Sequence, residues 1–147
     1  MGIRVDNWQS VLGSELRKKR DFVYGFSDCA MFAFDVVKAI TGVDIEEIDK
    51  RRGTYSTPFG YKKLLVKNGY EDIREWVADI CKSKNFNPIS VTVAKRGDLV
   101  MCLDPEEGQC VGVMSGDSGI FVTPEGDYVT VPRHELTDAW STSEWVA

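Results

Sequence analysis

The spacing of apolar residues changes once along the chain, near Pro88, and this change strongly limits the folds that the chain can adopt. Before Pro88, apolar residues recur at helical spacing, and after it they alternate between turns with a period of two. The 147 residues are enough for one domain with a buried core. We therefore expect a single α+β domain over residues 1–147, with N-terminal helices packed on a C-terminal antiparallel β-meander.

Two helices are expected before residue 43. Asp6 is predicted to cap the first, which carries apolar residues from Trp8 to Leu16. Asp28 is predicted to cap the second, and Gly42 to end it. The apolar residues of the second helix follow the spacing of one buried face: Cys29, Phe32, Ala33, Val36, Val37 and Ile40.

Two further helices and four strands complete the expected domain. The segment from Val43 to Tyr55 is polar and is expected to be an irregular surface segment. A helix is predicted to start at Thr57-Pro58, and another to run from about Glu71 to Cys81. Strands are predicted at residues 98–103, 109–115, 119–123 and 127–131, and the short turns between them can join only antiparallel neighbours.

Charge and composition exclude several classes of protein. The formal net charge is -5, which argues against a nucleic-acid partner, and we interpret the basic run Arg17 to Arg20 as the solvated end of a helix. No apolar stretch reaches the roughly 18 residues of a membrane segment, so we expect synthesis in the cytoplasm. The four cysteines lack CxxC spacing and there is a single histidine, so neither a metal site nor a cofactor is expected. Cys81 and Cys102 are expected to be buried, reduced thiols.

Cys29 follows a capping carboxylate at the start of an amphipathic helix. The unpaired amides of a helix N-terminus favour a thiolate, which is one way in which cysteine nucleophiles are activated. Cys29 also shares the stripe of Phe32 and Val36, so the alternative interpretation is the first core residue of the helix.

Several short motifs together resemble a known family. They are Tyr24-Gly25, Asp28-Cys29-Ala30, Gly97-Asp98-Leu99-Val100 and Val111-Gly112-Val113. Their order and spacing resemble the NlpC-type cysteine peptidases, a circularly permuted papain-like group that cleaves peptidoglycan stem peptides. Further segments resemble a small subgroup of tailed-phage and prophage proteins that are encoded among tail genes: Arg52 to Thr57, Val131-Pro132 and Ala139-Trp140.

The resemblance implies a role for each position of the site. Cys29 matches the nucleophile, Cys110 falls at the position of the family's catalytic histidine, and Thr123 falls near the residue that orients it. Tyr24, which matches a tyrosine of the family's substrate cleft, and Asp28 are the candidate binding residues, although Tyr24 could equally pack in its loop.

The cysteine at position 110 departs from the family's pattern. A thiol with an ordinary pKa of about 8.5 does not accept and return a proton near neutral pH as imidazole does. His134 is the alternative base, against a surface histidine next to Glu135. Cys29 and Cys110 are expected to face one another, either as reduced thiols or as a disulfide.

Three functions follow as hypotheses. The first is a phage tail-tip or tail-assembly protein with a degenerate active site, found in the virion and partnered by other tail proteins. Trp140 and Trp145 are then candidates for an interface, or alternatively for the core. The second is an active peptidoglycan hydrolase that uses Cys29, and the third is a thiol redox protein.

Overall fold

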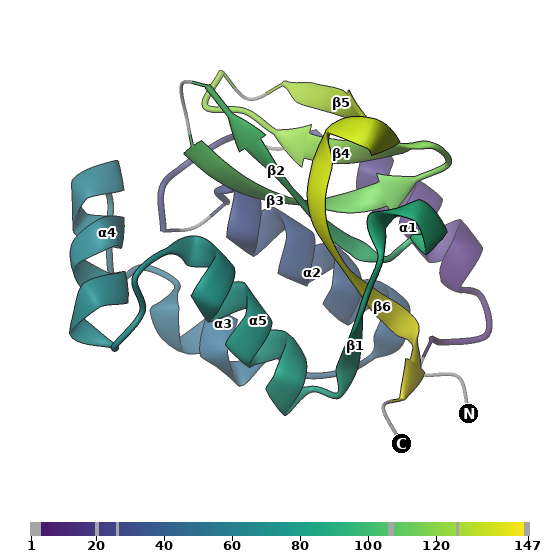
Figure 1. The fold of residues 1–147 in the computed structure, drawn as a ribbon, viewed down its shortest axis with the longest axis horizontal. Coiled ribbons are helices and arrows are strands. Elements are labelled where there is room, and N and C mark those ends of the chain that lie inside the picture. Colours follow the sequence, from purple (N-terminus) through teal and green to yellow (C-terminus); the bar gives the residue numbers. More distant parts are fainter. Residues whose placement is uncertain (1–3, 20, 26, 106–107, 126, 146–147) are drawn as a thin grey trace.

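The computed structural model describes residues 4–19, 21–25, 27–105, 108–125 and 127–145. Helices come first and strands follow (Figure 1). The helices are α1 (Trp8–Arg17), α2 (Cys29–Thr41), α3 (Glu46–Arg51), α4 (Pro58–Lys67) and α5 (Ile73–Ser83). The strands are β1 (Phe86–Ile89), β2 (Leu99–Asp104), β3 (Gly108–Ser115), β4 (Ser118–Val122), β5 (Tyr128–Pro132) and β6 (Leu136–Trp145), with single 3-10 turns at Val91–Val93 and Arg133–Glu135. The predicted α+β class is confirmed.

The six strands form one antiparallel sheet in the order β1-β6-β2-β3-β4-β5. The four predicted strands are β2 to β5, and they form the expected meander. The last strand, β6, was not predicted, and it returns across the sheet to lie between β1 and β2. The sheet is therefore a meander to which β6 and β1 are added. The pairing of β6 with β1 and β2 joins segments far apart in the sequence, so no local sequence pattern predicts it.

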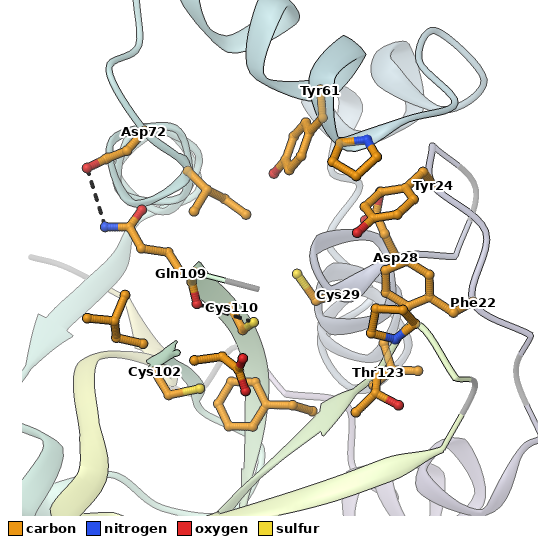
Figure 2. A pocket seen from close by; sticks show the side chains of 18 of the residues that line it. Phe22, Tyr24, Asp28, Cys29, Tyr61, Asp72, Cys102, Gln109, Cys110 and Thr123 are labelled. Atoms are coloured by element: carbon orange, nitrogen blue, oxygen red, sulfur yellow. Dashed lines mark hydrogen bonds between the residues drawn. The ribbon is translucent and has the colours of Figure 1, made fainter. Parts of the chain in front are cut away.

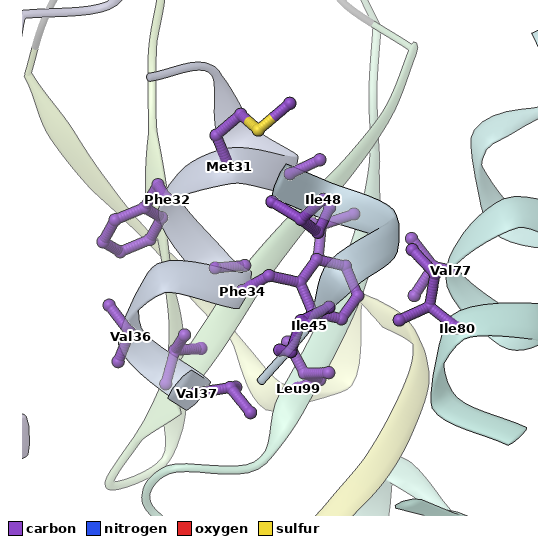
Figure 3. Close-up of a cluster of buried hydrophobic side chains, with 14 of the residues drawn as sticks. Met31, Phe32, Phe34, Val36, Val37, Ile45, Ile48, Val77, Ile80 and Leu99 are labelled. Carbon is purple, nitrogen blue, oxygen red and sulfur yellow. The ribbon is translucent and has the colours of Figure 1, made fainter. Parts of the chain in front are cut away.

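Helix α2 is the centre of the fold. It lies between the sheet and helices α3 and α5 (Figure 1), and its side chains are buried almost all round. The predicted stripe is buried except for the half-buried Cys29, and Ala30, Met31 and Phe34 are buried as well. Phe34 belongs to the same apolar cluster as Ile45 and Ile48 of the α3 region (Figure 3). A helix covered on all sides is apolar on all sides.

The ends of α2 are those that the sequence predicts. The Asp28 side chain accepts a hydrogen bond from the backbone N–H of Met31 at 3.1 Å, as an N-cap residue does. Gly42 closes the helix in the left-handed conformation, with φ of 70°.

Two local predictions are wrong. Helix α1 begins after Asn7 instead of Asp6, and no side chain caps it. The segment from Val43 to Tyr55 contains α3, which has acidic residues in its first turn, basic residues in its last, and a buried Ile48. Six residues are too few for a clear periodic pattern. The signal that could have revealed α3 was its charge order, acidic residues first and basic residues last, which complements the helix dipole. In the basic run, Arg17 to Lys19 are exposed, and Arg20 lies outside the described residues.

The two late tryptophans have different outcomes. Trp140 lies in β6 opposite Leu99 and is only 4% exposed, so it belongs to the core and not to an interface. The backbone of Trp145 pairs with Phe86, but its side chain lies outside the described part of the structure.

The Gly97-Asp98 motif joins three distant parts of the chain. Asp98 is 1% exposed, and its carboxylate accepts hydrogen bonds from Arg4 at 2.9 Å, Lys95 N at 2.8 Å and Thr142 N at 3.1 Å. Burial raises the pKa of Asp98, while these hydrogen bonds act in the opposite direction. The motif therefore holds the N-terminal segment, the start of β2 and the end of β6 together.

We expect Asp98→Ala to lower the free energy of unfolding by about 3–5 kcal/mol, because it leaves the buried Arg4 guanidinium without its carboxylate. Urea denaturation measures the loss. Asp117→Ala is the control, since Asp117 pairs with Arg133 at 3.4 Å with a side chain 98% exposed, and an exposed pair contributes about 0–1 kcal/mol. Similar losses in both variants would contradict the structural role of Asp98.

Candidate functional site

A cleft of about 820 Å³ opens where the start of α2 meets α4, the start of α5 and the ends of strands β2 to β5. Cys29, Cys102 and Cys110 all line it, and Cys110 lies between the other two (Figure 2). The strand that begins near residue 110 thus forms a wall of the same cleft into which Cys29 projects. This is the arrangement that the motifs predict for residues 29 and 110.

Asp28 fixes the position of Cys29. The Asp28 carboxylate is 2% exposed, and besides capping α2 it accepts hydrogen bonds from Gly25 N at 3.0 Å and from the Tyr55 hydroxyl. Both carboxylate oxygens are therefore engaged within the protein. Asp28 lines the cleft, but these bonds make it a positioning residue rather than a free ligand for substrate.

Gly25 allows the loop before α2 to pack closely. Its φ is 87°, and a Cβ atom there would lie 2.0 Å from the carbonyl oxygen of Tyr55. The loop places Tyr24 in the cleft wall, where its ring meets Phe22 edge to face at 4.8 Å. Tyr24 thus combines the two interpretations made from sequence, since it packs within its loop and also lines the cleft.

The surroundings of Cys29 favour its thiol over its thiolate. Its pKa is raised well above the usual value by a hydrogen bond to Cys110, by burial and by the charge of Asp28. The backbone N–H of Val111 acts in the opposite direction but does not reverse the shift. Cys110 and burial therefore act against the thiolate that the amides of the helix N-terminus favour.

Cys110 connects the two other thiols of the cleft. The neighbouring thiol of Cys102 is the main reason why the pKa of Cys110 is raised to about 12. The Cys110 thiol in turn lowers the pKa of Cys102. Cys110 also donates to the carbonyl oxygen of Gly108 at 3.6 Å. All four cysteines are free, so the structure holds Cys29 and Cys110 as reduced thiols.

The structure does not bring Thr123 and His134 into a catalytic arrangement. Thr123 lines the cleft, but its hydroxyl donates to the carbonyl oxygen of Asp127 at 3.2 Å within the β4–β5 turn instead of orienting Cys110. His134 lies exposed in the 3-10 turn before β6 and outside the cleft lining. Of the two interpretations of His134, the surface histidine is confirmed.

Three further cleft residues were not identified as site residues from the sequence. The Tyr61 ring stacks on Tyr55 at 4.7 Å, and its buried hydroxyl has no hydrogen-bond partner among the described residues. Burial is the main reason why the pKa of Tyr61 is raised. Gln109 donates to Asp72 at 3.3 Å and joins β3 to the start of α5. Cys102 is buried as expected, but it also contacts Cys110, and pairing the two predicted strands across their turn would have revealed this contact.

The described residues offer neither a metal site nor a membrane span. No three His, Cys, Asp or Glu side chains among them are arranged to hold a metal ion. In the same part of the chain, no helix is long and apolar enough to cross a membrane.

We expect alkylation of Cys29 by iodoacetamide to accelerate about tenfold per pH unit from pH 6 to pH 9, because the thiolate reacts and the raised pKa keeps its fraction small over this range. Peptide mass spectrometry after timed quenching measures modification at Cys29 separately from the other thiols. A rate of alkylation that is already constant above pH 6 would show a stabilised thiolate and would contradict a raised pKa for Cys29.

Comparison with known proteins gives a family assignment. No curated protein matches the chain. Residues 3–142 match the family described as "Domain of unknown function (DUF6950)". Because the match covers nearly all of the 147 residues, the chain belongs to this family.

Proposed function

We propose that the chain is a phage tail-tip or tail-assembly protein that uses an NlpC-like cysteine peptidase fold without its hydrolytic activity. The motifs that resemble the phage subgroup support the tail assignment. The cleft supports the loss of hydrolysis, because the group that faces Cys29 is the thiol of Cys110. Other tail proteins are the proposed partners, in a virion assembled in the host cytoplasm.

The proposal depends mainly on Cys110, which lines the cleft together with Cys29 and has a raised pKa. A cysteine peptidase needs a group that takes the proton of the nucleophile and returns it to the leaving group near neutral pH. The neighbouring Cys102 raises the pKa of Cys110 to about 12. At neutral pH the Cys110 thiol therefore keeps its proton, whereas an imidazole would exchange one. Losing such assistance costs about 10²- to 10⁴-fold in rate.

The rim of the cleft supports a role in binding other proteins. Three apolar side chains line the cleft and remain largely exposed, namely Val66 of α4, Leu103 of β2 and Val129 of β5, at 69%, 67% and 41%. Exposed apolar groups gathered at a concave site are typical of surfaces that bind a partner. We therefore place the contact with a neighbouring tail protein at this rim.

An active peptidoglycan hydrolase with Cys29 as nucleophile is the second candidate. Two observations favour it: Val111 N–H bonds to the Cys29 sulfur, and the unpartnered hydroxyl of Tyr61 could donate to a substrate carbonyl in the cleft. Groups of this kind stabilise charge in acyl transfer. A base is still required, and Cys110 does not supply one near neutral pH.

We expect the purified protein to release no more stem peptides from peptidoglycan than its Cys29→Ser variant, because Cys29 lacks a base. Mass spectrometry of the soluble fraction measures the release. Cys81→Ser serves as the control for cysteine replacement, since Cys81 is buried in the core away from the cleft. Release that persists in Cys81→Ser and disappears in Cys29→Ser would establish the hydrolase instead.

For the tail role, we expect Leu103→Glu to reduce incorporation of the protein into tails by about tenfold or more, because a charge at the centre of an apolar contact is strongly unfavourable. Quantitative mass spectrometry of purified virions measures incorporation. Val93→Glu is the matched control, because Val93 is 56% exposed but lies outside the cleft. Equal incorporation of both variants would contradict an interface at the rim, and absence of the wild-type protein from virions would contradict the tail assignment.

A further inference from the structure

Cys102 and Cys110 lie directly opposite each other in neighbouring antiparallel strands. Their register is set by the pairs on either side, Met101 with Val111 and Leu103 with Gln109. Opposed residues of such strands have Cα atoms roughly 4.5 or 5.5 Å apart and side chains on the same face. Disulfides span Cα separations of roughly 4.4–6.8 Å, so a bridge here needs no rearrangement of the sheet.

The side chains of Cys102 and Cys110 are both reached from the cleft. The neighbouring thiol of Cys110 is the main reason why the pKa of Cys102 is lowered. The Cys102 sulfur is therefore the favoured place for a thiolate, next to a thiol that still carries its proton. Both residues line the cleft, so a small solute can approach them.

We propose that Cys102 and Cys110 form a peroxide-sensitive dithiol site, which closes to a reversible cross-strand disulfide and leaves Cys29 as a free thiol. This proposal is independent of the proposed function, because it needs only the register of β2 and β3 and the cleft beside them. Hydrogen peroxide, or another small hydroperoxide, is the oxidant.

The reaction balances in two steps. The Cys102 thiolate attacks one oxygen of hydrogen peroxide, the O–O bond breaks, and the departing hydroxide takes a proton to form water while Cys102 becomes a sulfenic acid. The Cys110 sulfur then attacks the Cys102 sulfur, the S–O bond breaks, and the leaving hydroxide combines with the Cys110 proton as a second water. Overall, two thiols lose two electrons to one peroxide, and a dithiol reductant reverses the change.

The geometry favours Cys102 over Cys29 as the partner of Cys110. Cys29 belongs to a helix, and no strand pairing sets its distance from Cys110. Its thiol is also the harder one to deprotonate, because the hydrogen bond to Cys110 and burial raise its pKa. Among the described residues, no three His, Cys, Asp or Glu side chains are arranged to hold a metal ion.

The test is stoichiometric oxidation of the purified, reduced protein by hydrogen peroxide. We expect thiols titratable after denaturation to fall from four per chain to two, and dithiothreitol to restore all four. Trypsin leaves Cys102 and Cys110 on one peptide, residues 97–133, which a glutamate-specific protease splits at Glu106 and Glu107. Non-reducing mass spectrometry then identifies the bridge by the two fragments that it joins.

Serine variants supply the controls. Disulfide yield should be unchanged in Cys29→Ser and Cys81→Ser, and should fall at least about tenfold in Cys102→Ser and Cys110→Ser. Cys110→Ala repeats the second result with a different side chain, and circular dichroism checks that each variant is folded. The proposal is overturned if no pair of thiols is lost, if the bridge joins Cys29 to Cys110 or two chains, or if folded Cys110→Ser still forms an internal disulfide.

Discussion

The candidate site depends on one buried carboxylate, that of Asp28. It caps α2, the helix around which the core is built, and it also binds the backbone of Gly25 and the hydroxyl of Tyr55. A buried anion is tolerated there because helix amides and two further donors satisfy it and the helix dipole favours negative charge. The same bonds position Cys29 and the Tyr24 loop at the cleft, so the fold of the core and the geometry of the site share one set of interactions.

The thiol at residue 110 limits the chemistry that this geometry can support. An imidazole exchanges a proton near neutral pH, whereas hydrogen bonding raises the pKa of Cys110 to about 12. The cleft has a volume of about 820 Å³ and an apolar, partly exposed rim. This shape fits the proposed role in binding, and the thiols that line the cleft fit the proposed dithiol site.

Local patterns were sufficient where a whole element carried its own signals. The boundaries of α2 follow from Asp28 and Gly42, and strands β2 to β5 follow from alternation between short turns. The meeting of Cys29 with Cys110 could also be anticipated, through the order of the motifs. The placement of β6 between β1 and β2 could not, because partners so far apart in sequence share no local pattern. The burial of Trp140 follows from that pairing and was equally inaccessible.

By itself, the sequence determined the fold class and the ends of the central helix, since these depend on residue type and on spacing along the chain. Only the tertiary structure decided how the thiols behave. The high pKa of Cys29 arises from Cys110 and from burial, whereas the lowered pKa of Cys102 arises from Cys110 in the neighbouring strand and is opposed by burial. Proton affinities depend on distances through space and on exclusion of water, and the chain acquires both only when the helices pack on the sheet.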